Sequence, residues 1–225
     1  MMEKEELKKH VEEIIKETFS RLDKAYQNNR EGIKKSQTHE KGESRIVFPC
    51  YDEHQDYRVR ISEQELRFAF VETFNTYCDI NSLKLFYSIE TPTQDTYSGF
   101  ANINKEPKPD PNGRSAEFDL VIYDEQFNRI GLFEFKANNA GEHDHWKDFV
   151  KLENEKEGND KVLRYFIEVI KSYTSGDSEN TTIGSLKRKI EKKGKNTIFR
   201  CYALEGESSK KKDIIKGEDI SKEFE

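Results

Sequence analysis

The sequence has few of the features that mark secreted, membrane-bound or zinc-binding proteins. It contains three cysteines, Cys50, Cys78 and Cys201, an odd number without CxxC spacing. A disulfide framework or a cysteine zinc site is therefore not expected, and the cysteine usage fits a reducing cytoplasm. No apolar run approaches the ~20 residues of a membrane-spanning helix. The polar start of the chain predicts no secretory signal. We therefore expect a cytoplasmic protein without a membrane partner.

Several active-site motifs are also missing. The chain has no GxxxxGK or GxGxxG segment and no local Ser-His-Asp or Cys-His pattern, so neither a nucleotide cradle nor a nucleophile triad is indicated. The net charge of −6 argues against a protein coated with nucleic acid by bulk electrostatics, although one basic face is enough for local binding. Hydrophobic residues make up only 33% of the 225 residues. The chain therefore suits one sizeable core built from short apolar runs.

The first third of the chain predicts two amphipathic helices. In residues 3–28, apolar side chains recur at three- and four-residue spacing from Leu7 to Tyr26, without glycine or proline. This stripe must bury against the main domain, which we favour, or against another copy of the chain in a homodimer. A polar linker to residue 45 follows, with short strands at 46–51 and 57–61. Ser62 and Glu65 then form a capping box, which predicts a helix from Glu63 to about Tyr77.

The rest of the chain alternates apolar runs with turn-rich segments. We expect strands at residues 83–89, 116–123, 129–137, 161–173 and 196–204, and helices at 143–157 and 183–193. Residues 91–114 hold four of the five prolines and predict a long irregular loop. The strands at 116–123 and 129–137 are expected to form a β-hairpin. The sequence thus predicts an α/β domain over 46–204 with a mixed β-sheet flanked by helices. Residues 1–45 form an N-terminal helical extension and residues 205–225 a charged C-terminal tail.

The predicted hairpin carries the chemistry. Because strand residues alternate between faces, the apolar faces are expected to hold Phe118, Leu120 and Ile122, and Gly131, Phe133 and Phe135. The opposite faces hold Asp119 on the first strand, and Glu134 and Lys136 on the second. If the hairpin turns at Gln126, Asp119 lies nearly opposite Glu134.

Burying charge near the centre of a sheet is costly unless a partner compensates. Mg²⁺ or Mn²⁺ bound by Asp119 and Glu134 would compensate, since such ions take carboxylate and phosphate oxygens. Lys136 could orient the attacking water and stabilise charge on the phosphorus. The chemistry that this pattern indicates is in-line attack of water on a phosphodiester.

The pattern resembles the PD-(D/E)XK nuclease superfamily, which has the restriction-endonuclease-like fold. In that family an acidic residue lies on the second core strand and a (D/E)-X-K triplet on the third, and Asp119 and Glu134-Phe135-Lys136 match these positions. The resemblance covers residues 57–173, and extends to 204 if the last strand completes the sheet. It implies metal-dependent cleavage of nucleic acid, for which we expect DNA. No proline precedes Asp119, and the Pro109-Asp110 pair falls in the loop.

The resemblance also implies a glutamate on the preceding helix. Glu65 is the first choice because it lies in the first turn and off the apolar stripe. Glu72 is the rival, and Glu63 also falls in this range.

Other interpretations stand beside the nuclease site. Asp119, Glu134 and Lys136 could form a cross-strand charge ladder on a solvated face, and a nuclease fold without activity could serve as a protein- or nucleic-acid-binding module. Residues 185–200 carry a local excess of basic side chains, which predicts phosphate contacts or a solvated amphipathic helix. The basic candidates for nucleic-acid binding are Lys187, Arg188, Lys192 and Lys193. Minor contributors to the cleft are His143 and His145, with Lys147 and Lys151 as weaker candidates for phosphate contacts.

Overall fold

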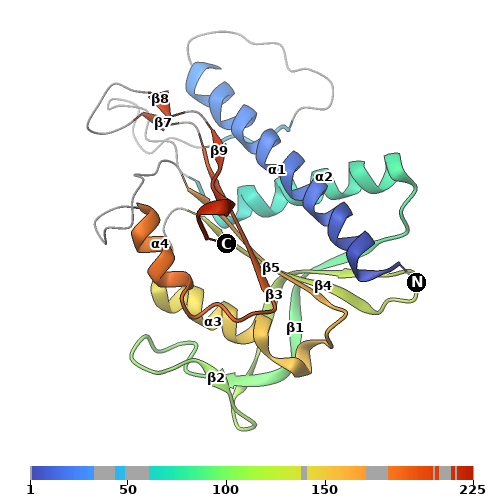
Figure 1. The fold of residues 1–225 in the computed structure, drawn as a ribbon, viewed down its shortest axis with the longest axis vertical. Coiled ribbons are helices and arrows are strands. Elements are labelled where there is room, and N and C mark those ends of the chain that lie inside the picture. The colour runs from blue at the N-terminus through green and yellow to red at the C-terminus, as the bar shows by residue number, and fades with distance from the viewer. Residues whose placement is uncertain are drawn as a thin grey trace.

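The computed structural model describes residues 2–32, 44–48, 61–137, 141–170, 182–204, 206–207, 214–215 and 217–224. These residues form a mixed α/β fold, in which helices flank a seven-stranded sheet of order β2-β1-β3-β4-β5-β6-β9 (Figure 1). Residues 44–48 lie outside any strand. The remainder of the short strands predicted at 46–51 and 57–61 lies almost wholly outside the described residues.

The helices and strands follow the predicted order closely. The helices are α1 (Lys4–Gly32), α2 (Glu63–Asn81), α3 (Glu142–Glu153), α4 (Thr182–Ile190) and the 3-10 helices η1 (Glu155–Glu157) and η2 (Ser221–Phe224). The main strands are β1 (Phe86–Ser98), β2 (Lys108–Pro109), β3 (Arg114–Tyr123), β4 (Arg129–Ala137), β5 (Leu163–Ile170), β6 (Thr197–Ala203) and β9 (Glu218–Asp219). The short strands β7 (Gly206–Glu207) and β8 (Ile214–Ile215) pair separately. The segment predicted as a charged tail therefore adds β9 to one edge of the main sheet.

The sheet combines an antiparallel and a parallel half. Strands β1, β3 and β4 are antiparallel neighbours, as the predicted hairpin requires. Helix α3 then crosses over so that β5 runs parallel to β4, and α4 crosses over so that β6 runs parallel to β5. Every residue of β5 is buried, which explains why its sequence is mostly apolar apart from Arg164 and Glu168, because a central parallel strand is covered on both faces.

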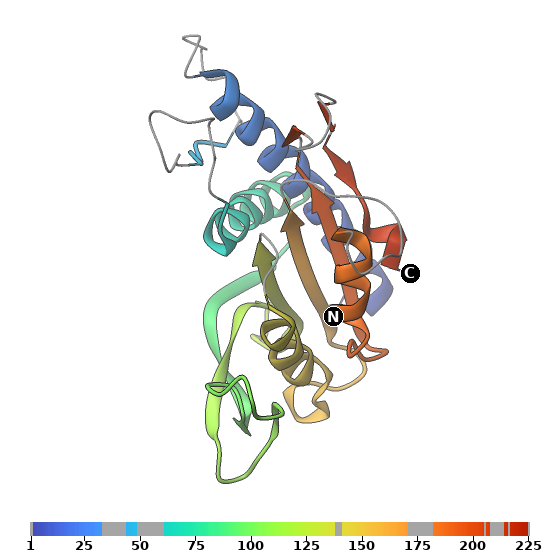
Figure 2. The ribbon, with the colours of Figure 1, turned by 90° about the vertical axis from the view of Figure 1, so that its left-hand side faces the viewer.

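Helix α1 belongs to the main core. It lies beside α2, while α3 lies beside α4 (Figures 1 and 2). The apolar stripe of α1, from Leu7 to Tyr26, is buried in the same cluster as α2 and one face of the sheet. Glu12 also accepts hydrogen bonds from Arg200 on β6 at 2.8 and 2.9 Å and from the Tyr165 hydroxyl at 2.9 Å. The stripe is thus used within its own chain and is not available to a second copy.

The loop predicted at 91–114 is instead partly strand. β1 continues through Pro92 to Ser98, and its register against β3 shifts between Pro92 and Thr96. Because β2 pairs only with Tyr97 and Ser98, the earlier part of β1 has no strand partner on that side and tolerates a proline and a bulge.

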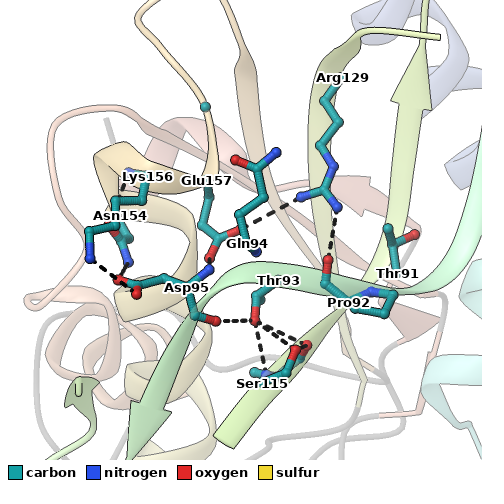
Figure 3. A network of polar contacts seen from close by, with 12 residues as sticks. Thr91, Pro92, Thr93, Gln94, Asp95, Ser115, Arg129, Asn154, Lys156 and Glu157 are labelled. Carbon is teal, nitrogen blue, oxygen red and sulfur yellow. Dashed lines mark hydrogen bonds and ion pairs between the residues drawn. The ribbon is translucent and has the colours of Figure 1, made fainter. Parts of the chain in front are cut away.

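A buried carboxylate stabilises this bulge (Figure 3). Glu157 of η1 is fully buried. It accepts hydrogen bonds from the backbone N–H groups of Gln94 and Asp95, at 2.8 and 2.9 Å, and from the Tyr97 hydroxyl at 2.7 Å. The backbone N–H groups of Gln94 and Asp95, which a neighbouring strand would otherwise bind, are therefore satisfied by the Glu157 side chain, more than fifty residues away in sequence.

Candidate active site

The β3–β4 hairpin brings Asp119 beside the second strand. Leu120 pairs with Phe133 and Val121 with Leu132, and this register, continued by one step, sets Asp119 opposite Glu134. The Asp119 carboxylate accepts a hydrogen bond from the backbone N–H of Phe135 at 2.7 Å. Its side chain remains 24% exposed, so Asp119 is reachable from solvent.

The alternation of faces breaks at Asp119. Leu120 packs on the side of α1 and α2, whereas Phe118 packs in the cluster beneath α3 and α4. The predicted common face of Phe118, Leu120 and Ile122 is therefore wrong. On the neighbouring strand, Glu90 has a positive φ of 48°, and the β1–β3 pairing skips from Ile89 to Thr91 at this point. This local distortion turns β3 and directs Asp119 towards α2.

Glu134 and Lys136 are buried on the face of the sheet that α3 covers, with residue exposures of 2% and 6%. The Lys136 ammonium lies 2.7 Å from Oδ2 of Asp148 and 3.4 Å from Oε1 of Glu63, and donates to the Phe135 carbonyl at 3.1 Å. The charged ladder on an open face is therefore excluded, since these side chains are enclosed by α2 and α3.

Two residues of α3 complete the cluster: Asp148, for which the sequence predicted no role, and Lys151, which is buried here rather than open to phosphate contacts. Asp148 is 1% exposed and Lys151 is 5% exposed. The Lys151 ammonium lies 2.5 Å from Oε1 of Glu134 and 2.9 Å from Oδ1 of Asp148, and it donates to the Glu117 carbonyl at 2.8 Å. Their spacing of three residues on one helix face was a visible signal, but many acid–base pairs in so charged a chain share it.

Burial and pairing shift the pKa values of this cluster in opposite directions. Burial raises the pKa of Glu134 well above 4.5, and Asp148 adds to the rise, while Lys151 opposes it. Burial would also raise the pKa of Asp148, but Lys151 and Lys136 outweigh it and lower that pKa from 3.8 to about 2. Burial favours neutral lysines, yet Asp148 and Glu134 hold the pKa of both ammonium groups above 10.5. Asp148 is thus the firmly ionised acid between the two lysines.

The helix glutamate that reaches the cluster is Glu63 rather than Glu65. Glu63 lies 3.4 Å from Lys136 and its side chain is 44% exposed. Partial burial raises the pKa of Glu63 above 4.5 even though Lys136 opposes the rise. Glu65 instead accepts from the Ser62 backbone N–H at 2.7 Å, as a capping box requires, and also from the Ser62 hydroxyl. Glu72 accepts from the Ser44 hydroxyl at 2.9 Å.

Arg67 lies at the outer rim of the site. Its Nη1 is 3.8 Å from Asp119 and 3.4 Å from Glu90. Counted together, the cluster has five carboxylates (Glu63, Glu90, Asp119, Glu134, Asp148) and three cations (Arg67, Lys136, Lys151). With all of them ionised, five minus three leaves an excess of two negative charges, and the raised pKa values of Glu134 and Glu63 reduce this excess.

The two histidines near α3 have separate positions. His145 is fully buried, with Nε2 at 2.8 Å from Glu168 on β5 and Nδ1 at 3.0 Å from the Gly141 carbonyl. It therefore ties the start of α3 to β5. His143 is half-buried, and Lys147 pairs with Asp144 at 2.9 Å on the surface of α3.

The basic segment lies on and after α4. Lys187 and Arg188 are in the last turn of α4, and the helix ends before Lys192 and Lys193. The Lys192 ammonium lies 3.3 Å from the centre of the Trp146 ring and 3.8 Å from Glu142, and Lys193 donates to the Thr197 carbonyl at 3.0 Å. These two lysines are thus engaged within the chain, although neither is sequestered from solvent.

Within the part of the chain that the structure describes, no group of three or more histidine, cysteine, aspartate or glutamate side chains is arranged to hold a metal ion by itself. No described helix is long and apolar enough to cross a membrane. No family model, curated protein or solved structure matches the chain. The function is therefore inferred from the geometry and chemistry of the cluster itself.

Proposed function

We propose that this protein is a metal-dependent nuclease of the restriction-endonuclease-like type that hydrolyses phosphodiester bonds in DNA. One observation carries the proposal: Asp119 on β3 and Glu134 and Lys136 on β4 meet Glu63 of α2 in one cluster. The order α2, β1, β3, β4, α3, β5, with an antiparallel meander followed by a parallel crossover, supports it. This order of elements is the one that the resemblance implies, with an acidic residue on the second core strand and a Glu-x-Lys triplet on the third.

The donor set suits Mg²⁺ or Mn²⁺. Both ions prefer oxygen ligands and are often held by one or two carboxylates together with water and substrate phosphate oxygens. Asp119 and Glu134 are such carboxylates, and Asp119 is open to solvent. The Lys151 ammonium against Glu134 indicates that this position favours a positive charge. Asp119 and Glu134 would hold the metal, which when bound supplies Lewis-acid activation of water and the phosphate.

The remaining side chains have roles in hydrolysis that follow from their charge and position. Lys136 stabilises the negative charge that develops on the phosphate oxygens. Glu63, half-exposed and with a raised pKa, is the carboxylate placed to take a proton from water, since a base works best when its pKa approaches the working pH. A P–O bond forms from the water oxygen, one ester P–O bond breaks, and the leaving oxygen takes a proton from solvent. Lys187, Arg188, Lys192 and Lys193 would contact phosphates outside the site.

A nicking assay on supercoiled plasmid tests the proposal. The full chain is incubated with Mg²⁺ or Mn²⁺, and wild type is compared with Asp119→Ala and Lys136→Ala. We expect each variant to cut at least about 100-fold more slowly, because each loses a charge aimed at the transition state. Lys16→Gln on the exposed surface of α1 is the matched control and should cut like wild type. Equal cleavage by all four proteins would remove the assigned site. Single-stranded RNA in a parallel reaction distinguishes ribonuclease from deoxyribonuclease activity.

A binding module without activity is the second candidate, and one observation favours it. The charged groups of the cluster already pair with one another: Lys136 contacts Asp148, Glu63 and the Phe135 carbonyl, and Lys151 contacts Glu134, Asp148 and the Glu117 carbonyl. Such a network also stabilises a fold without any chemistry. Calorimetry separates the two candidates. Metal uptake at millimolar Mn²⁺ is expected of the nuclease, and its absence would favour the binding module.

A further inference from the structure

We propose that Lys151 is a positioning residue that holds the Glu134 carboxylate when no metal is bound and yields this place to the metal on binding. The inference rests on the proposed function, because it assigns a role to a residue beside one of the two metal ligands. It adds α3 to the machinery of a site that the strand residues and Glu63 define.

Lys151 has three polar neighbours. The ammonium lies 2.5 Å from Glu134 and 2.9 Å from Asp148 and donates to the Glu117 carbonyl at 2.8 Å. The side chain is 6% exposed and that of Glu134 only 2%. An ammonium this close offsets part of the cost of burying the carboxylate. Lys151 is the cation that contacts Oε1 of Glu134 in the absence of metal.

Asp148 couples the two lysines of the site. Its Oδ1 lies 2.9 Å from Lys151, and its Oδ2 lies 2.7 Å from Lys136. One turn of α3 therefore fixes the position of two ammonium groups, that of Lys136 in the Glu-x-Lys triplet and that of Lys151 beside Glu134. Burial of Phe149 and Leu152 on the same helix holds this turn against the sheet, so both lysines keep a defined position.

A divalent ion and Lys151 compete for the same carboxylate. A divalent ion held by Glu134 would repel the nearby Lys151 ammonium, and a buried setting screens this repulsion poorly. Lys151 has two remaining partners, Asp148 and the Glu117 carbonyl, and can therefore keep these contacts when the ion displaces it from Glu134. Displacing Lys151 from Glu134 costs free energy and so lowers the affinity for the metal. Removing the positive charge of Lys151 should therefore raise that affinity.

Calorimetric titration of the full chain with MnCl2 tests this directly. Lys151→Gln keeps hydrogen-bond donors but removes the charge, and we expect it to bind Mn²⁺ about tenfold more tightly than wild type. Lys16→Gln, on the exposed surface of α1, is the control and should bind within about twofold of wild type. A merely structural role for Lys151 predicts unchanged or weaker binding.

The outcomes separate this inference from the proposed function. If wild type binds Mn²⁺ and Lys151→Gln binds it equally or more weakly, the role of Lys151 is overturned while the metal site stands. If neither binds Mn²⁺, the metal site itself fails, and the inference fails with it.

A measurement on wild type covers the case in which Lys151→Gln does not unfold cooperatively. The lysine Cε–Nζ signals are followed by NMR during addition of Mg²⁺, with Lys151 assigned from Lys151→Arg, which keeps the charge. We expect the Lys151 signal to shift in step with metal uptake, because its contact with Glu134 is exchanged. Saturable Mg²⁺ binding that leaves this signal unmoved would overturn the exchange.

Discussion

Replacing Glu157 by alanine tests the account of the β1 bulge. The fully buried carboxylate accepts hydrogen bonds from the N–H groups of Gln94 and Asp95 and from the Tyr97 hydroxyl, and lies 3.7 Å from Arg129. Hydrogen bonds to a charged group contribute about 1.5–3 kcal/mol each, but their sum is not additive. Removing one partner of a buried charged network costs about 3–5 kcal/mol. We therefore expect Glu157→Ala to lose about 3–5 kcal/mol of unfolding free energy.

Urea unfolding followed by circular dichroism measures this loss, with the free energy extrapolated linearly to water. Glu155→Ala changes an exposed glutamate of the same 3-10 turn and should stay within about 0.5 kcal/mol of wild type. Burial and the hydrogen bond to Glu157 raise the pKa of Tyr97, so ultraviolet titration should find that pKa lower in the variant. A loss below about 1 kcal/mol, or one equal to that of Glu155→Ala, would refute the role of Glu157 in stabilising the bulge.

Three further predictions concern stability. Ser62→Ala removes the cap of α2 and should cost about 1 kcal/mol in urea unfolding; no change would mean that the capping box adds nothing. Ile14→Ala empties a fully buried site on α1 and should cost about 2–5 kcal/mol in a single transition, whereas a helix outside the core would show a much smaller loss. Because the pKa of Asp148 falls from 3.8 to about 2 on folding, its charge stabilises the fold above pH 3.8 and loses this effect as the pH drops through 2. The advantage of wild type over Asp148→Asn should therefore shrink by roughly 2 kcal/mol between pH 4 and pH 2, and a constant difference would contradict this.

The features that sequence alone determined are local ones. The sequence predicted the helix over residues 3–28, which in the structure continues to Gly32, together with the capping box at Ser62 and the hairpin strand over residues 129–137. Periodicity, capping and turn chemistry depend on residues only a few positions apart, so the local sequence is enough to predict them. The same holds for the opposition of Asp119 and Glu134, since a short turn fixes the register of a hairpin.

The tertiary structure alone decided which charged side chains meet. With 44 acidic residues among 225, sequence spacing could not single out Asp148 and Lys151 as partners of Lys136 and Glu134, nor Glu157 as the partner of β1. Glu63 and Glu65 share the first turn of α2, yet only the packing of that helix against β4 brings Glu63 to Lys136. Whether a charged side chain is solvated or paired depends on burial and on neighbours from distant segments, because ionic and hydrogen-bonding preferences are satisfied by whichever group the fold sets within about 3–4 Å.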